Sequence, residues 1–207
     1  MSGRFITFEG AEGSGKSTQI AFAQEYLKQQ GHDVLLLREP GGVKISERVR
    51  DLLLDVDNTE MCRECEVLLY MAARAQLVAE VLVPALEQGR LVLCDRFLDS
   101  TLVYQGYGIG VALSAIRDIG RFATRSIRPD ITLVFDIDAA EGLRRAGDNK
   151  DRIEQRSLDY HQKVREGYLE LSRQEPERIR VISADRSRGE IFADVRRALD
   201  GCLEKRS

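Results

Sequence analysis

A phosphate-binding motif stands near the start of the chain, where residues 10–17 read GAEGSGKS and fit the pattern G-x-x-x-x-G-K-[S/T]. The motif follows a mostly apolar run, 5–8, and opens an amphipathic segment, which is the strand-then-helix context that the pattern requires. Glycines let successive backbone N–H groups point at phosphate oxygens, and a helix N-terminus adds partial positive charge. We expect this loop to bind a nucleoside triphosphate, with Lys16 at the β- and γ-phosphates and Ser17 on Mg²⁺.

Charged residues also follow two other apolar runs, which we interpret as strands. Arg38 ends the first run and begins the segment REPGG, in which Pro40 and the two glycines predict a rigid, closely approachable loop. Asp95 and Arg96 end the second run. Ligands of open α/β sheets bind at the carboxyl ends of the strands. The two arginines therefore predict a site for a second phosphate, with Asp95 placed to support Mg²⁺ or its waters.

A third cluster surrounds Arg74, which lies between alanines in a long apolar segment. Two interpretations remain open. In the first, Arg74 donates a hydrogen bond to a base carbonyl, and Tyr70, one turn earlier, stacks on the base. In the second, the methylene groups of Arg74 pack on apolar surface while its guanidinium remains in water. The segment 100–106, STLVYQG, adds hydroxyls, a ring and an amide that suit the edge of a pyrimidine.

The motifs leave several functional classes to compare. A GTPase would carry the guanine-reading sequence N-K-x-D, whereas residues 149–152 read NKDR, which excludes this class. A nucleotide-gated binding module without phosphoryl transfer would not need arginines at two strand ends. A small P-loop kinase fits best, and a related kinase with a different acceptor remains the alternative.

A hydrophilic segment in the second half of the chain, residues 144–152, reads RRAGDNKDR. The phosphate loop contains no arginine between Gly10 and Gly15, so a catalytic cation beyond Lys16 has to come from elsewhere. We expect a lid near 144–156 that closes over the nucleotide. An ordinary solvated charge run is the alternative.

The positions of these motifs predict an α/β fold. Apolar runs alternate with amphipathic segments, which indicates a parallel sheet covered on both faces. The expected strands are 4–9, 33–37, 91–95, 131–136 and 178–182. The expected helices are 16–30, 45–54, 62–88, 112–127, 139–146, 155–173 and 188–204, with Pro84 kinking or dividing the long one near its end. We predict one domain spanning 1–207.

Composition excludes several other classes. The 207 residues carry a net charge of −3, which argues against a nucleic-acid partner. The longest apolar stretch, 67–73, is far shorter than the ~20 residues of a membrane span, so we expect no membrane partner and a cytoplasmic location. Cys62 and Cys65 have CxxC spacing, but a structural zinc site needs a second pair, so we expect half-buried thiols at a helix start.

Taken together and in order, the motifs resemble bacterial thymidylate kinases along nearly the whole chain. The matching pieces are Phe8-Glu9-Gly10, Gly15-Lys16-Ser17, Arg38-Glu39-Pro40-Gly41-Gly42, Ala72-Ala73-Arg74, Asp95-Arg96, Tyr104-Gln105-Gly106, Arg128-Pro129-Asp130 and Asp151-Arg152-Ile153-Glu154. The resemblance implies a three-layer P-loop NTPase fold with five parallel strands in the order 2-3-1-4-5. It also implies the reaction ATP + dTMP → ADP + dTDP with Mg²⁺, and a homodimer to which the apolar helix around 66–86 could supply the face.

The same resemblance implies roles for individual residues. Those implied to bind ATP are Gly10, Ala11, Glu12, Gly13, Ser14, Gly15, Lys16, Ser17, Thr18 and Arg186. Those implied to bind dTMP are Glu12, Arg38, Pro40, Tyr70, Arg74, Arg96, Ser100, Thr101, Tyr104 and Gln105. Those implied to be catalytic are Lys16, Arg96, Arg152 and Arg145, with Arg152 as the first choice of lid arginine and Arg145 as the second. Ser17 and Asp95 are implied to hold Mg²⁺.

Two residues depart from the family pattern. The base-stacking position is usually Phe, whereas this chain has Tyr70, whose hydroxyl needs a partner. The residue after the REPGG segment is commonly Thr, whereas this chain has Val43, which lacks the hydroxyl. We expect both departures to affect substrate affinity rather than the reaction.

Overall fold

The computed structural model describes residues 3–147 and 151–204 and contains one five-stranded parallel sheet. The strands are β1 (Arg4–Gly10), β2 (Val34–Arg38), β3 (Leu91–Asp95), β4 (Ile131–Asp136) and β5 (Ile179–Ser183). Their order, β2-β3-β1-β4-β5, confirms the predicted topology. Each strand boundary lies within one residue of its predicted position. The five apolar runs were therefore sufficient to locate the sheet.

The apolar runs form strands because the sheet is covered on both faces. The central strands β1, β3 and β4 are buried along nearly their whole length, as continuous apolar sequence requires. The edge strands β2 and β5 instead alternate between buried and less buried residues. The parallel register pairs Arg38 with Asp95 and Asp95 with Phe8. The predicted motifs therefore lie together at the carboxyl edge of the sheet.

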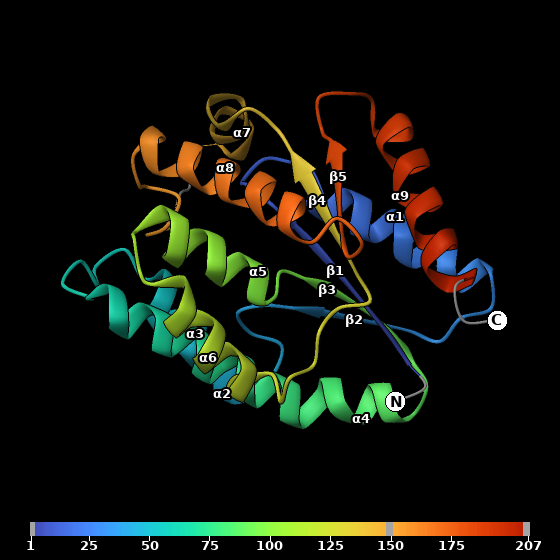
Figure 1. The fold of residues 1–207 in the computed structure, drawn as a ribbon, viewed down its shortest axis with the longest axis horizontal. Coiled ribbons are helices and arrows are strands. Elements are labelled where there is room, and N and C mark those ends of the chain that lie inside the picture. The colour runs from blue at the N-terminus through green and yellow to red at the C-terminus, as the bar shows by residue number, and fades with distance from the viewer. Residues whose placement is uncertain (1–2, 148–150, 205–207) are drawn as a thin grey trace.

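Helices form a layer on each face of the sheet (Figure 1). On one face, α1 (Lys16–Gln29) packs with α9 (Arg188–Glu204) through Ile20, Leu27 and Val195. On the other face lie α3 (Arg63–Leu77), α5 (Leu98–Thr101), α6 (Leu113–Ala123) and α8 (Leu158–Gln174). Two further helices, α2 (Lys44–Leu54) and α7 (Ala139–Ala146), follow strands β2 and β4.

The long helix predicted at 62–88 is a rod with a local change of winding. It consists of α3, a π-helical turn η1 (Val78–Leu82) and α4 (Val83–Glu87). Pro84 lacks a backbone N–H and cannot donate within the helix, so the predicted disruption falls in the turn before it. By length and mean hydropathy, 1.5, this rod could cross a membrane. However, its Val67, Met71 and Val78 pack into the two clusters on this face of the sheet, as in a core helix.

One helical segment was not predicted from the sequence. The short helix α5 continues into the π-helical turn η2 (Leu102–Gly108) directly after the Asp95-Arg96 motif. It packs on α6, α8 and the end of β1, so Ser100, Thr101, Tyr104 and Gln105 face the interior. The segment therefore converts a loosely polar stretch of sequence into one wall of the site.

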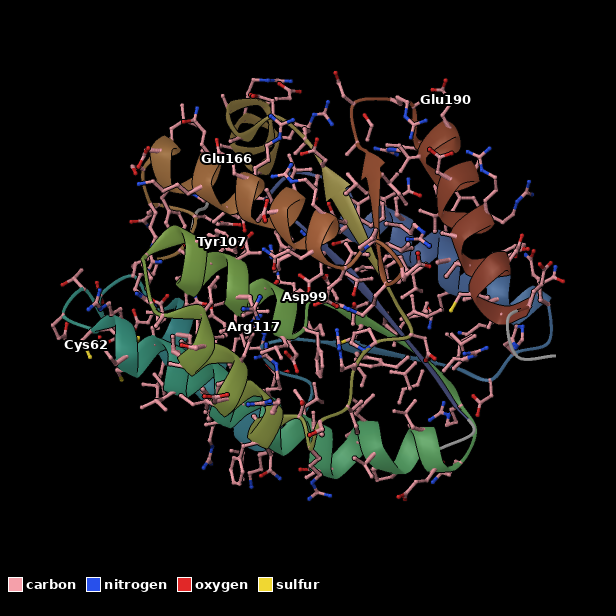
Figure 2. The ribbon with its side chains drawn as sticks, viewed as in Figure 1. Cys62, Asp99, Tyr107, Arg117, Glu166 and Glu190 are labelled. Atoms are coloured by element: carbon pink, nitrogen blue, oxygen red, sulfur yellow. The ribbon has the colours of Figure 1, made fainter. Side chains whose placement is uncertain are left out.

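The two cysteines of the CxxC pair lie at the start of α3, as expected, but both are exposed rather than half-buried. Figure 2 shows Cys62 at the periphery of the molecule. Cys62 caps the helix, since its Sγ accepts a hydrogen bond from the Cys65 backbone N–H at 3.4 Å. Within 3–147 and 151–204, no cluster of three or more His, Cys, Asp or Glu residues is arranged to hold a metal.

Candidate active site

The phosphate loop joins β1 to α1 and is folded around its own lysine. Gly13 and Gly15 have φ angles of 65° and 80°, a conformation in which a side chain would be strained. The Lys16 ammonium donates to the carbonyl oxygens of Gly10 and Ala11 at 2.9 and 3.1 Å. The Ser14 hydroxyl donates to the Ala11 carbonyl at 2.7 Å. The loop is therefore held by contacts among its own residues.

The protein around Lys16 does little to stabilise the positive charge of its ammonium group. Burial, aided by the nearby Arg96 guanidinium, lowers the pKa of Lys16 from 10.5 to about 8, although the carboxylates of Asp95, Glu12 and Glu9 oppose the shift. A triphosphate would supply the negative charge that this ammonium needs. The loop therefore has the electrostatics of an anion site.

The start of α7 is pressed directly against the phosphate loop. A Cβ on Gly13 would lie 2.0 Å from the Gly142 carbonyl oxygen, and a Cβ on Gly142 would lie 2.5 Å from the Glu12 carbonyl oxygen. Arg145, one turn further along α7, therefore lies beside the loop. Its guanidinium bonds to Glu141 at 2.7 Å and reaches the Ala184 carbonyl at 3.3 Å, after strand β5.

Arg186 lies in the same connection after β5 and bonds to the Ser183 carbonyl and the Asp194 carboxylate. Arg186, implied to bind ATP, therefore lies within the loop between β5 and α9, and Arg145 contacts the same loop through the Ala184 carbonyl. Arg145 thus connects this loop to the phosphate loop. Residues 148–150 of the predicted lid lie outside the described residues.

A cavity of about 340 Å³ connects the phosphate loop to the second cluster of predicted residues. Thirteen of the residues predicted from the sequence line it, namely Glu12, Gly13, Lys16, Ser17, Pro40, Tyr70, Arg74, Asp95, Arg96, Ser100, Thr101, Tyr104 and Gln105. Glu39, Arg50, Leu54, Asp151, Ile153 and Glu154 line it as well. Sequence motifs that are up to about 140 residues apart therefore share one cavity, because the parallel strands end at one edge.

Arg96 and Glu12 form the centre of the cavity wall. Arg96 has a φ of 69°, and its Nη2 donates to Glu12 Oε1 at 3.0 Å. The Tyr104 hydroxyl donates to the same oxygen at 2.7 Å, and its ring lies 4.9 Å from the Arg96 guanidinium carbon. Burial alone would raise the pKa of Glu12, but contacts with His161, Arg96 and Lys16 outweigh it and hold the pKa well below its ordinary value. Glu12 is therefore ionised.

Arg74 is buried and ion-paired, which corrects the interpretation of a surface arginine with its head in water. Its side chain is 2% exposed, and its Nε donates to Glu39 Oε2 at 2.8 Å. Its remaining nitrogens donate to the Thr101 hydroxyl at 3.0 Å and the Phe97 carbonyl at 2.9 Å. Burial raises the pKa of Glu39, while Arg74 opposes the shift. This fixed guanidinium can present its edge to a ligand in the cavity.

Arg38 lies beside the cavity but does not line it. Its guanidinium bonds to the Pro40 carbonyl at 3.0 Å and to Glu47 at 2.8 Å, and its side chain is 46% exposed. Arg50 donates to the same Pro40 carbonyl at 3.0 Å and does line the cavity. Sequence reasoning missed Arg50, although its position in the amphipathic segment 45–54 could have indicated it.

Val43, the first departure from the family pattern, is the residue before helix α2 and cannot cap it with a hydroxyl. Its side chain is instead buried against Leu37 and Leu77. Glu47 does not replace this cap, but its Oε1 accepts from the Gly42 backbone N–H at 2.6 Å and so holds the preceding loop. The loop before α2 therefore keeps its shape without the hydroxyl.

The part of the cavity wall that contains Tyr70 and Gln105 is organised by a carboxylate that the sequence did not single out. Glu66, only 1% exposed, accepts from Gln105 at 2.9 Å through Oε1. Through Oε2 it accepts from Arg156 at 2.6 Å and contacts Arg152 at 2.8 Å. Tyr70, one turn after Glu66, lines the cavity, and burial together with Glu66 raises the pKa of its hydroxyl.

Arg152 therefore already has protein partners outside the cavity. Besides Glu66, its Nε donates to the Leu53 carbonyl at 2.9 Å and its Nη2 contacts the Met61 sulfur. Arg152 does not line the cavity, whereas its neighbour Asp151 does. In this arrangement Arg152 fastens the base of the predicted lid to α2 and α3.

Asp95 and Ser17 meet the chemical requirements for Mg²⁺. Both line the cavity beside Lys16. Among the described residues, Asp95 Oδ1 is buried without a hydrogen-bond partner, which is costly for a carboxylate oxygen unless something else binds it. Oxygen ligands of this kind are the ones that Mg²⁺ prefers. The residues present therefore fit the metal that the sequence implied.

Glu9 is a buried acid behind the cavity wall that sequence reasoning did not assign to the site. Its oxygens accept from the Phe97 backbone N–H at 2.7 Å, the Ser100 hydroxyl at 2.5 Å and the Tyr168 hydroxyl at 2.8 Å. Burial, reinforced by the Asp99 charge, raises its pKa from 4.5 to about 7. The sequence did contain a signal for Glu9, namely a charged residue at the end of an apolar strand. Glu9 fixes the start of α5 and, with it, the position of Ser100.

A phosphate loop on the first strand faces an arginine-lined pocket at the same edge of a 2-3-1-4-5 sheet, and this arrangement defines a P-loop nucleoside monophosphate kinase. The family model described as "Thymidylate kinase" matches residues 8–195. The chain belongs to the thymidylate kinase family.

Known relatives agree with this placement. The chain is 47% identical over 203 residues to a thymidylate kinase of Symbiobacterium thermophilum, covering 98% of this chain and 95% of the relative. It is 44% identical over 209 residues to that of Bacillus pumilus, covering 99% of both. Among solved structures, it is similar to a thymidylate kinase from Ehrlichia chaffeensis, with a TM-score of 0.79, 32% identity and coverage of 96% and 99% of the two chains.

Proposed function

We propose that this protein catalyses ATP + dTMP → ADP + dTDP as one nucleoside monophosphate kinase domain spanning residues 1–207. The single observation that carries the proposal is the cavity that joins Lys16 of the phosphate loop to the arginines Arg74 and Arg96. A donor triphosphate and an acceptor monophosphate bound at its two ends would bring their phosphates together. Phosphoryl transfer depends mostly on such positioning and on charge stabilisation.

On the donor side, the backbone of residues 10–18 binds the ATP phosphates, and Lys16 neutralises the charge that develops at the transferred group. Mg²⁺ held by Ser17 and Asp95 would add charge neutralisation at the phosphate oxygens when bound. Arg186, after strand β5, flanks the adenine. The loop supplies most of its contacts from the main chain, so its glycines matter as much as its lysine.

On the acceptor side, Arg96 and Arg38 hold the dTMP phosphate, and Pro40 shapes the loop between them. Arg74 donates to a thymine carbonyl, Tyr70 stacks on the ring, and Thr101 and Gln105 flank its edge. Glu12 and Tyr104 lie near the deoxyribose, with Ser100 beside Arg96 at 3.3 Å. Each of these side chains is already held by protein contacts, which reduces the entropy lost on binding.

The contacts of the two candidate lid arginines support a different choice from the one expected from the sequence. Arg145 projects from α7 beside the phosphate loop, whereas Arg152 is held by Glu66 and is 11% exposed. We therefore propose Arg145 as the lid arginine that acts on the transferred phosphoryl group and Arg152 as an anchor for the lid base. This reverses the order expected from the sequence.

A coupled assay that detects ADP tests the proposal directly. Purified protein with ATP and Mg²⁺ is given dTMP, dUMP, UMP, CMP or GMP in turn. We expect turnover with dTMP to exceed turnover with every other acceptor. Faster turnover with another monophosphate would assign the protein to a sister kinase, and ATP binding without ADP release for any acceptor would make it a binding module.

We also propose that the protein is a homodimer that works in the cytoplasm, where ATP and nucleoside monophosphates occur. Exposed apolar side chains on packed helices support a dimer face: Leu52 on α2 is 52% exposed, Leu68 on α3 is 54% exposed and Phe122 on α6 is 86% exposed. Sedimentation of the wild type and of Leu68→Asp tests this face. We expect the substitution to shift the dimer toward monomer, and an unchanged sedimentation coefficient would place the interface elsewhere.

A further inference from the structure

His161 is a buried residue of α8 to which none of the motifs assigns a role. It is 1% exposed, and among the described residues neither ring nitrogen has a hydrogen-bond partner. Its Nδ1 lies 3.4 Å from Glu12 Oε2, and that oxygen is itself buried without a partner. Two unsatisfied groups that face each other at this distance are rare in a protein interior, where buried polar groups are almost always bonded.

The two oxygens of Glu12 have different neighbours. Oε1 accepts from Arg96 at 3.0 Å and from Tyr104 at 2.7 Å, so it faces the cavity. Oε2 lies toward His161, which does not line the cavity. A neutral imidazole carries one N–H, and its position is set by the partner that can accept it. Of the two neutral tautomers, only the one with the proton on Nδ1 gives Glu12 Oε2 a donor, and the imidazolium also carries this proton, so the pair assigns a proton to Nδ1.

The proposed function makes this contact important during binding. A phosphate held by Arg96 competes with Glu12 Oε1 for the same guanidinium. Glu12 would then lose its charged partner while remaining buried and ionised, which is costly without another donor. His161 stands on the opposite side of the carboxylate and can keep it in place. Contacts of this kind are commonly long in ligand-free structures and shorten in the complex.

We propose that His161 is a positioning residue for the acceptor site, which holds Glu12 through an Nδ1–H to Oε2 hydrogen bond so that Arg96 is free to bind the acceptor phosphate. This inference rests on the proposed function and concerns the same cavity. His161 does not line the cavity itself and therefore acts through Glu12. The Tyr160 ring packs edge-on against the imidazole at 5.2 Å and keeps it facing Glu12.

The test compares two substitutions of nearly equal shape. Asn places an amide N–H close to the Nδ1 position, whereas Leu fills the same space without a donor. We expect His161→Leu to raise KM for dTMP about tenfold, with KM for ATP nearly unchanged, because a hydrogen bond to a charged group is lost on the acceptor side only. We expect His161→Asn to recover most of the loss.

A third variant keeps the test decisive if His161→Leu does not fold. Gln places its amide near Nε2 rather than Nδ1, so His161→Gln should resemble Leu in KM for dTMP while remaining polar. Thermal melting of all variants identifies any general loss of stability. Equal KM values for the Asn and Gln variants, or an unchanged KM for dTMP in the Leu variant, would overturn the inference. A wild-type protein that does not phosphorylate dTMP would instead overturn the proposed function.

Discussion

The donor and acceptor halves of the cavity are built by different means. The donor loop is eight consecutive residues, 10–17, whose contacts are mostly from the backbone and from Lys16 to its own loop. The acceptor half consists of side chains from the ends of two strands and from helices α2 and α3 and the segment 98–108. A contiguous loop carries its geometry with its sequence, whereas the acceptor half exists only when the whole domain is folded.

The two halves also differ in how their cations are held. Lys16 is bonded to neutral carbonyls, so its charge awaits a ligand. The three arginines assigned to dTMP each have a carboxylate partner already: Arg96 has Glu12, Arg74 has Glu39 and Arg38 has Glu47. The acceptor side is therefore pre-ordered by ion pairs, and a ligand must share or displace a carboxylate to bind there. Substitutions in the two halves should therefore differ in their effects on stability and on turnover.

The largest expected effect comes from breaking the buried acceptor pair. Glu39→Leu leaves the Arg74 guanidinium, 2% exposed, without its carboxylate, and such a loss costs about 3–5 kcal/mol of unfolding free energy. Glu47→Leu breaks the exposed pair with Arg38 together with the bond from the Gly42 backbone N–H, and should cost about 1–2 kcal/mol. Urea unfolding of the two variants measures both. Equal losses would show that burial does not distinguish these pairs.

Breaking the donor side should affect turnover rather than folding. Lys16→Met removes the cation of the phosphate loop and should lower kcat by a factor on the order of 10²–10³, as for other groups that stabilise developing charge. Lys16→Met also removes the hydrogen bonds to the Gly10 and Ala11 carbonyls, but it relieves the burial of a charge, which the lowered pKa of Lys16 shows to be unfavourable in the free protein. We therefore expect the melting temperature to change little. Steady-state kinetics and thermal melting check the two parts, and a large drop in melting temperature would contradict the contrast between the halves.

The lid arginines give a smaller, paired prediction. Arg145→Ala should lower kcat by roughly 10²-fold with little change in dTMP affinity, because the group acts on charge that develops during transfer. Arg152→Ala should lower kcat less and instead loosen the segment fastened to Glu66, which proteolysis near residues 151–156 would detect. The reverse order of kcat values would restore Arg152 to the catalytic role that the sequence suggested.

The smallest expected effect is on pH dependence. In the free enzyme the pKa of Lys16 is about 8, so the ammonium loses its proton, and its attraction for phosphate, above that pH. We expect kcat/KM for ATP to be level near pH 7 and to fall up to tenfold per unit above about pH 8. Bound phosphates favour the charged form, so the corresponding fall in kcat should occur at higher pH. Coinciding falls in the two profiles would argue against Lys16 as their source.

The donor half could be read from the sequence because its parts are adjacent. The glycines, Lys16 and the flanking apolar run define loop, strand and helix at once. The ends of the predicted strands located Arg38 and Arg96, and a long apolar segment located Arg74. The sequence did not predict how these side chains are oriented. Whether Arg74 is buried depends on Glu39, which comes thirty-five residues earlier in the chain.

The unpredicted parts depend on long-range packing. Segment 98–108 has weak helical periodicity and becomes helical because it is enclosed by α6, α8 and β1. Asp99 illustrates this, because it lies in the interior in Figure 2 and binds Arg178 at 2.6 Å, seventy-nine residues away. Glu66, Arg50 and His161 were likewise missed, since each gains its role only from a distant partner.

The contact between Gly13 and Gly142 has a mechanical consequence. The backbone of the phosphate loop and the backbone of α7 are in contact there, with no side chain between them. The two segments should therefore move together as one rigid unit. The lid closure that we propose would therefore require bending further along the chain than Gly142. A larger residue at either glycine would clash with main-chain atoms of the other segment. A second substitution at the other glycine could not relieve this clash, because the clashing atoms belong to the backbone.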